Sequence, residues 1–219
     1  MNENTSVSRR FTNECASYDV VGRSFGGYEN NGEARSWANL PAWAIIDQEA
    51  ANSHDLNGGE KGIPGPSFEK FDTLEALAEA CGIDKEGLLT EVARYNANAE
   101  KGEDPDFGRG QNYYGQNSIY TSTDYEGPFR TLQPLATPPF YAAEIVPVVL
   151  GTMGGIKTNA RDETLDTVGN VIARLYAQGN AAGSGTGGAC YVAGGGSLGP
   201  ALAFGEIAAQ QIADLGPWA

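Results

Sequence analysis

The stretch YVAGGGSLGPALAFG, residues 191–205, joins three consecutive glycines to an apolar segment. Glycine has no Cβ and reaches positive φ, so such a run lets the backbone approach another group closely. The segment after it has apolar residues near helical spacing: Leu198, Leu202, Ile207 and Ile212. We therefore predict a helix over 197–213, with Ser197 at its N-cap and Pro200 in its first turn.

Two interpretations of this glycine-rich approach remain open on residue chemistry alone. The first turn of a helix carries free backbone N–H groups and the positive end of the helix dipole, which favour an electron-rich ligand. A tight loop packed against neighbouring backbone needs the same glycines.

The charge balance excludes some classes of partner. The chain has 219 residues with 14 basic and 28 acidic side chains, a formal net charge of −14. Nucleic acid and anionic membrane surfaces are bound through basic patches, so neither is expected as a partner. No apolar run is long enough to span a bilayer and no signal peptide is recognised, so the location is unknown, with the cytoplasm as the default.

The cysteines and the histidine carry no recognisable catalytic or metal pattern. Cys15, Cys81 and Cys190 are odd in number and show no C-x-x-C spacing, so no metal site and no disulfide framework is predicted. His54 lies in a polar stretch and has no nucleophile motif beside it.

The pattern along the chain is that of an α+β protein. We predict buried strands at 42–47 and within 139–149, separated by a long loop over 51–68 and a pair of helices. Asp72 with Glu75 is expected to start the first helix, and Gly82 to end it. Asp84 and Gly102 are expected to bound the second. A hairpin around 168–170 and a strand running into Gly179 are predicted to follow.

Four stretches taken in order carry a family resemblance: RRFTNECASYD, PFYAAEIVPVVLGTMGGIKTNAR, ARLYAQGNAAG and YVAGGGSLGPALAFGEIAA. Together they resemble the FAD-dependent fumarate reductase and succinate dehydrogenase flavoproteins. That group includes the 3-ketosteroid dehydrogenases, flavocytochrome c and urocanate reductase. The resemblance implies an FAD-dependent oxidoreductase that is similar to the 3-ketosteroid dehydrogenases in its motifs.

The resemblance also implies a domain organisation. Residues 1–19 would contain a strand bridging from the FAD domain, residues 20–145 would form a substrate (cap) domain, and residues 146–219 would supply C-terminal segments of a Rossmann-like FAD-binding domain. The G-x-G-x-x-G fingerprint of the dinucleotide-binding half is absent from this sequence. A missing N-terminal FAD-binding chain or segment is thus an expected partner, and this chain alone should hold FAD weakly.

The resemblance assigns cofactor contacts to backbone-rich positions. The helix after the glycine-rich turn would point its N-terminus at the pyrimidine end of the flavin, where amides favour developing negative charge. The positions implied to contact the flavin are Gly154, Gly155, Gly179, Asn180, Gly196, Ser197 and Leu198.

Two tyrosines point to a neutral substrate. Matching the motifs places Tyr18 and Tyr191 where the dicarboxylate-reducing members carry arginines, and Gly151 where a histidine often stands. A carboxylate calls for a cationic partner, whereas a phenol suits a ketone oxygen or the proton beside it. By resemblance, Tyr18 moves the proton, and Tyr191 with the Gly195 amide polarises the carbonyl of an enone or ketone.

Two alternatives are kept. A reductase of an unsaturated acid such as fumarate or urocanate would need a cation from elsewhere, with Arg23 and Arg130 as candidates by charge. A non-catalytic structural subunit or a truncated fragment would explain the absent fingerprint.

Overall fold

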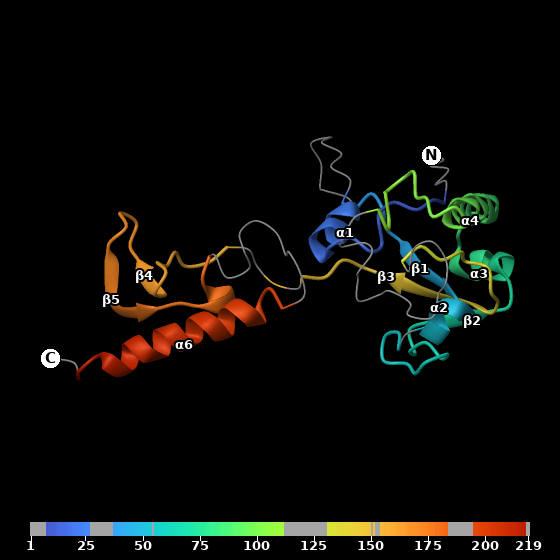
Figure 1. Cartoon of the computed structure of the whole chain (residues 1–219). Helices are drawn as coiled ribbons and strands as arrows, with labels where there is room; N and C mark the ends of the chain where they lie inside the picture. Colours follow the sequence, from blue (N-terminus) through green and yellow to red (C-terminus); the bar gives the residue numbers. More distant parts are fainter. Residues whose placement is uncertain are drawn as a thin grey trace. The chain divides into compact units, whose positions relative to one another are not determined.

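A computed structural model describes residues 8–26, 37–53, 55–111, 131–149, 151, 154–183 and 195–217. The chain divides into two compact units: Met1–Ala16 with Val20–Pro147, and Ser17–Asp19 with Val148–Ala219. We call these the large unit and the small unit and treat each by itself. Figure 1 labels their elements, which mix helices and strands as the α+β prediction requires.

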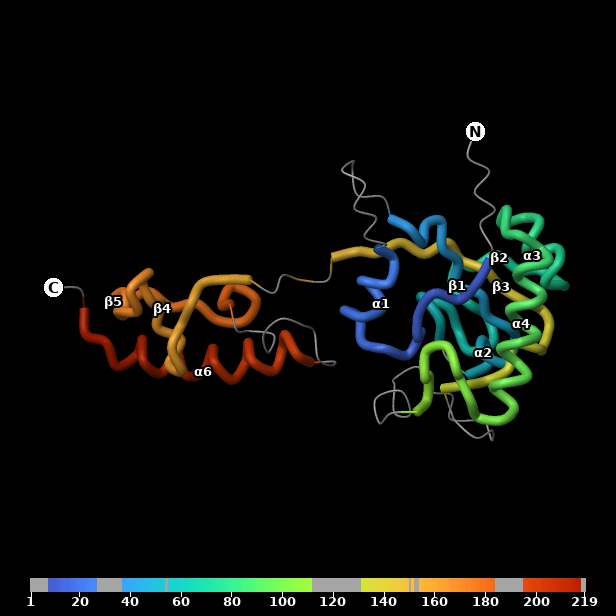
Figure 2. Tube along the Cα trace, turned by 90° about the horizontal axis from the view of Figure 1, so that it is seen from above, coloured from blue at the N-terminus to red at the C-terminus, as the bar shows by residue number. Residues whose placement is uncertain are grey.

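The large unit is built on a three-stranded antiparallel sheet of order β1-β3-β2. Its elements are β1 (Ala42–Asp47), α2 (Gln48–Ser53), β2 (Glu69–Phe71), α3 (Leu74–Cys81), α4 (Lys85–Ala99) and β3 (Phe140–Ile145). The helix α1 (Tyr18–Ser24) belongs to this unit from Val20 on, and its first two residues are assigned to the small unit. The central strand β3 pairs with β1 from Ala42↔Ile145 to Asp47↔Phe140. This register brings residues about a hundred positions apart into one sheet (Figure 2).

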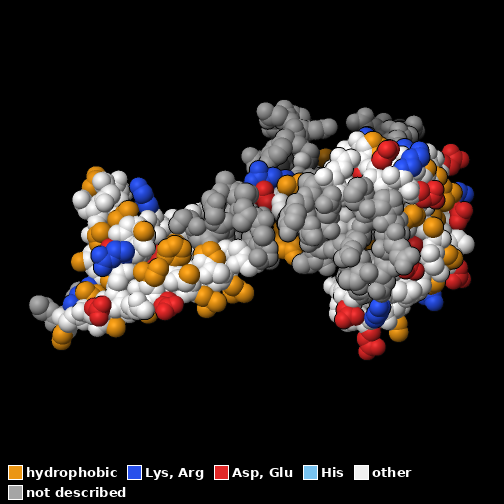
Figure 3. Space-filling view, in the orientation of Figure 1, with side chains coloured by type: hydrophobic (Ala, Val, Ile, Leu, Met, Phe, Trp, Pro, Cys, Tyr) orange, Lys and Arg blue, Asp and Glu red, His pale blue; other side chains and the backbone are white. Residues whose placement is uncertain are grey.

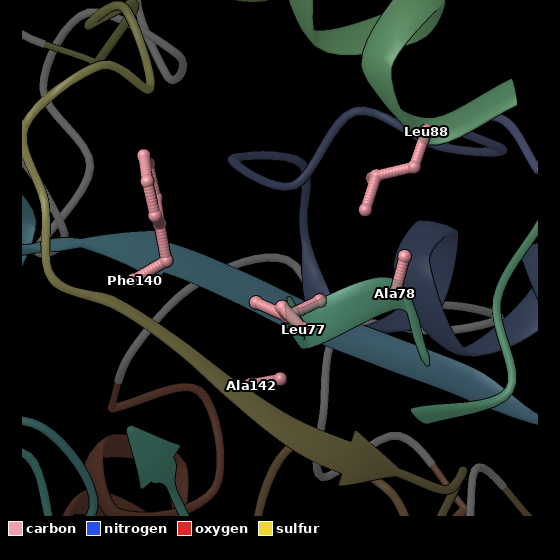
Figure 4. Close-up of a cluster of buried hydrophobic side chains, with 5 residues drawn as sticks. All are labelled: Leu77, Ala78, Leu88, Phe140 and Ala142. Carbon is pink, nitrogen blue, oxygen red and sulfur yellow. The ribbon is translucent and has the colours of Figure 1, made fainter. Parts of the chain in front are cut away.

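The core of the large unit lies where α3 and α4 meet the sheet. Its buried members are Leu77, Ala78, Leu88, Phe140 and Ala142, and Figure 4 shows Leu77 and Ala78 of α3 between Leu88 of α4 and the two β3 residues. Leu77 and Ala78 have no exposed surface at all. The apolar faces of the two helices are therefore the faces that bury against the sheet.

The side chain of Asp47, at the end of β1, binds the segment that leads into β3 through hydrogen bonds. Its carboxylate accepts hydrogen bonds from the amides of Ala50, Ala136 and Thr137, each at 3.0 Å. The side chain is buried, with 2% of the residue exposed. A buried carboxylate is tolerated because these three donors replace its hydration.

The small unit is a hairpin with a long helix. It contains β4 (Glu163–Leu165), β5 (Val171–Tyr176), the 3₁₀ turn η1 (Gly179–Ala181) and α6 (Leu198–Asp214). The carboxylate of Asp166 closes the hairpin turn by accepting from the amides of Val168 and Asn170. The predicted hairpin and the predicted helix over 197–213 are both confirmed.

Several local predictions need correction. Thr73, not Asp72, caps α3, because its hydroxyl accepts from the Ala76 amide at 3.1 Å. Asp84 caps α4 as predicted, but that helix ends at Ala99, before Gly102. The loop expected over 51–68 begins only after α2, and the short polar strand β2 follows it, unpredicted.

Ser197 occupies the N-cap position of α6 but makes no capping hydrogen bond. A capping hydroxyl accepts from the amide two or three residues further on. Pro200 has no N–H, and the Gly199 amide already donates to the Gly195 carbonyl at 2.8 Å. The proline and the glycine turn thus leave the serine without a donor to accept from.

The strand expected within residues 1–19 is also absent from the described residues 8–19. Asn13 instead organises a turn there: its side-chain oxygen accepts from the Cys15 amide, and its carbonyl accepts from the Ala16 amide. Such local bonds compete with strand pairing, and α1 begins directly afterwards at Tyr18.

Candidate functional site

In the small unit, several glycine-containing segments lie close to the start of α6. Ile156 and Ala182 form a parallel bridge, and a Cβ placed on Gly155 would lie 2.5 Å from the Ala181 carbonyl oxygen. No side chain fits at Gly155, so this glycine is required for the two segments to approach.

A second close approach joins η1 to the first turns of α6. Gly179 has a φ of +60°, and a Cβ there would lie 3.1 Å from the Cβ of Ala201. The next residue, Asn180, points its amide nitrogen toward Gly151, where a Cβ would lie 3.6 Å away. Gly151 and the segments at 154–156, 179–183 and 197–201 therefore come together within one unit.

The predicted cofactor positions fall on this meeting point. Gly154, Gly155, Asn180 and Leu198 are exposed, and Gly179 is buried beneath α6. Gly196 and Ser197 are half-buried at the start of that helix. Exposed glycine backbone beside a helix N-terminus is a suitable surface for a planar, electron-accepting ring. The residues present fit the pyrimidine end of a flavin.

The predicted catalytic residues are only partly described. Tyr18 is the first residue of α1 and is 44% exposed. Gly195 is exposed, has a φ of +83°, and a Cβ there would meet no described atom within 4 Å. Tyr191 lies outside the described residues, as do His54, Cys190 and Arg130.

A cavity of about 210 Å³ lies in the small unit between the 158–162 loop, η1 and α6. Its wall includes Asp162, which is 4% exposed and has a φ of +60°. Within the described part of the chain, one buried carboxylate oxygen of Asp162 has no hydrogen-bond partner. Burial raises the pKa of this carboxyl group.

We expect Asp162→Asn to stabilise the chain at neutral pH by about 1 kcal/mol, because asparagine tolerates positive φ and carries no charge to bury. A raised folded-state pKa means that the aspartate costs stability as pH rises above its unfolded value, about 3.9. The gain should shrink toward zero below that pH. Urea unfolding of the wild type and the variant at pH 7 and pH 3.5 measures the gain in unfolding free energy at each pH.

Asp166→Asn is the matched control, in the same hairpin region. Hydrogen bonds from the Asn170 backbone, together with those from Val168 and Gly169, lower the pKa of Asp166. This substitution should not stabilise at pH 7. Equal stabilisation by both variants would contradict the assignment of the effect to the buried charge.

No group of three or more metal-ligating side chains occurs among the described residues. None of the described helices is long and apolar enough to cross a membrane.

Comparison with known proteins identifies the family. A family model described as an FAD binding domain matches residues 4–198. The chain belongs to this FAD-binding family. The fold class expected from the resemblance is thereby supported at the level of a mixed helix-and-sheet flavoprotein fold.

Two characterised relatives align with 94% of the chain. The 4-oxocyclohexanecarboxylate 2-dehydrogenase of Sinomonas cyclohexanicum is 36% identical over 206 residues, which are 35% of that protein. The 3-oxosteroid 1-dehydrogenase of Mycolicibacterium smegmatis is 37% identical over 213 residues, which are 37% of that protein. This FAD-binding family member thus spans little more than a third of the length of these relatives.

A solved structure agrees with the sequence comparison. The 3-ketosteroid Δ1-dehydrogenase of Sterolibacterium denitrificans, in complex with 1,4-androstadiene-3,17-dione, superposes with a TM-score of 0.71 at 32% identity. It covers 94% of this chain, which corresponds to 37% of that protein. The predicted resemblance to the ketosteroid dehydrogenases is confirmed.

Proposed function

We propose that this chain forms part of an FAD-dependent oxidoreductase that transfers hydride between the flavin and a neutral conjugated ketone or enone. The observation that carries the proposal is the meeting of Gly155, Gly179 and the start of α6 in one unit of an FAD-family chain. The name of one relative, an oxosteroid dehydrogenase, describes dehydrogenation of a neutral cyclic ketone. The name of the other, an oxocyclohexanecarboxylate dehydrogenase, describes dehydrogenation of a cyclic ketone that also carries a carboxylate.

Each candidate residue would have its own role in the reaction. The backbone at Gly155, Gly179 and the start of α6 would hold FAD, which would supply the hydride chemistry. Tyr18 would take the proton from the substrate carbon beside the carbonyl group. Tyr191 and the Gly195 amide would donate hydrogen bonds to the carbonyl oxygen, where negative charge develops as that proton leaves.

The flavin would be held by backbone more than by side chains. The amides at Ser197 and Leu198 belong to the first turn of α6, where the helix dipole favours negative charge on the pyrimidine ring. Gly154, Gly155 and Gly196 would let the ring approach the main chain, and Gly179 with Asn180 would run alongside the cofactor.

The surface of α6 suggests what completes the site. Its large apolar side chains are exposed: Leu198 by 71%, Leu202 by 74%, Ile212 by 51%, Phe204 and Ile207 by 38% each. Figure 3 shows hydrophobic side chains gathered along this helix. Apolar surface of this extent is normally covered. A further FAD-binding segment or chain is the proposed cover.

Turnover by the FAD-loaded holoenzyme tests the proposal. A 3-ketosteroid, 4-oxocyclohexanecarboxylate and fumarate would be compared with suitable artificial electron donors and acceptors. We expect turnover with the 3-ketosteroid, which is a neutral ketone, and none with fumarate. Turnover of fumarate alone would establish the acid reductase instead, and inactivity toward all three would support a non-catalytic chain.

The visible absorption spectrum of the isolated chain tests how FAD is held. With the adenosine half of the cofactor uncontacted, we expect less than stoichiometric flavin after purification, because association must overcome several kcal/mol of lost freedom. Flavin bound at full occupancy would contradict the expectation that a further segment completes the site.

A further inference from the structure

An ionic cluster, of which Asp104 is buried and Glu14 is exposed, involves the residues just before α1. It consists of two arginines and two carboxylates: Arg10, Glu14, Asp104 and Arg109. Arg10 and Glu14 belong to the motif that precedes Tyr18, and the other two come from the loop after α4. All four lie in the large unit.

The guanidinium group of Arg10 contacts two carboxylates and two aromatic rings. It donates to both oxygens of Glu14, at 2.8 and 2.7 Å, and to both oxygens of Asp104, at 3.0 and 3.1 Å. The rings of Tyr95 and Phe107 lie 4.9 and 5.2 Å from its central carbon. Doubly bidentate pairing with aromatic contacts fixes an arginine in one orientation.

The two carboxylates that bind Arg10 also accept hydrogen bonds from Arg109. Asp104 has a side chain only 2% exposed and also accepts from the Arg109 amide at 3.1 Å. The Arg109 side chain donates to Glu14 at 3.1 Å, which closes the ring of charges. Burial alone would raise the pKa of Asp104, but the hydrogen bond and charge of Arg10 lower it, so the pair remains ionised.

The cluster therefore clamps residues 10–14 to the loop at 104–109. Asn13 adds a further contact by donating from its side chain to the Phe107 carbonyl, and its own turn passes directly into α1. Only Cys15, Ala16 and Ser17 separate Glu14 from Tyr18, and Cys15 is buried.

We propose that Asp104, through Arg10, is a positioning residue for Tyr18. This inference rests on the proposed function, in which the Tyr18 hydroxyl moves a proton beside the substrate carbonyl. Proton transfer requires donor and acceptor within hydrogen-bond reach, so a shift of about 1 Å at the start of α1 can cost about 10²-fold in rate.

Asp104→Asn in the FAD-loaded holoenzyme tests the inference. Asparagine keeps the shape but accepts through one oxygen only, so the bidentate clamp on Arg10 is lost. We expect kcat for the ketone substrate to fall about 10²-fold with little change in KM, because the proton moves in the transition state. Asp104→Glu, which restores the charge, should recover part of kcat.

Asp47→Asn is the matched control. Asp47 is equally buried in the same unit, receives three hydrogen bonds, and has no contact with the cluster among the described interactions. Its substitution should lower the unfolding midpoint while leaving kcat unchanged at temperatures where the protein is folded. Equal kcat losses in the two variants would overturn the inference by showing a general loss of stability.

A double-mutant cycle separates this inference from the function on which it rests. If Asp104 acts through Tyr18, adding Asp104→Asn to Tyr18→Phe should cause no further loss of kcat. Additive losses would overturn the positioning role and leave the proposed function standing. Wild-type turnover in Tyr18→Phe alone would remove Tyr18 from the mechanism, and the inference with it.

Discussion

Replacing Tyr18 by phenylalanine should lower kcat of the FAD-loaded holoenzyme by about 10²–10⁴-fold, the usual worth of a general acid or base. The substitution removes one oxygen and keeps the ring, so the packing of α1 should change little. KM should move far less than kcat, because the proton is transferred in the transition state. Steady-state kinetics with a ketone substrate measures both constants.

Tyr191→Phe is the comparison variant. Its proposed hydrogen bond to the carbonyl oxygen exists in the bound substrate and strengthens as charge develops. This variant should therefore raise KM as well as lower kcat. A Tyr18→Phe enzyme with near-normal turnover would instead mark Tyr18 as a packing residue, and another group would have to carry the proton.

Leu77→Ala should cost about 2–5 kcal/mol of unfolding free energy, the range for removing a buried leucine side chain. Leu77 is fully buried in the core between α3, α4 and β3, so the cavity left behind cannot be filled from solvent. Since whole domains are stable by only about 5–15 kcal/mol, this one change could unfold much of the large unit at 37 °C. Urea titration followed by circular dichroism provides the measurement.

Leu198→Ala makes the same chemical change on a surface. Leu198 is 71% exposed in the chain by itself, so its loss should alter the unfolding free energy by about 0.5 kcal/mol or less. Similar losses for the two leucines would contradict the assignment of the core to the α3–β3 contact.

The parts of the fold that the sequence predicted are those with local signals. The apolar stripes of α3 and α4, the left-handed Gly82 after α3 and the Asp84 cap each act within a few residues. The three-residue strand β2 was missed because Glu69–Phe71 has no alternation to detect, and it is specified by pairing with β3. Long-range pairing of this kind leaves little trace in a short segment.

In the candidate site, too, features with local sequence signals were predicted and features that depend on distant residues were not. Glycine runs and a helix start marked the positions proposed to face the flavin, because close backbone approach demands a particular residue type. The cluster that holds Arg10 went unrecognised, since Asp104 is 94 positions away and one buried aspartate resembles any other. The missing cap at Ser197 depended on Pro200, whose lack of an N–H matters only once the helix start is known.

The apolar surface of α6 also bears on how a cell would treat this chain, if a further segment covers that helix as proposed. Chaperones and quality-control proteases recognise exposed hydrophobic segments, and Leu198, Leu202 and Ile212 offer one along a single helix. Covering that helix would hide the recognition signal at the same moment as it completes the flavin pocket. Cellular lifetime would thus be coupled to cofactor assembly, so that copies unable to hold FAD are the ones removed.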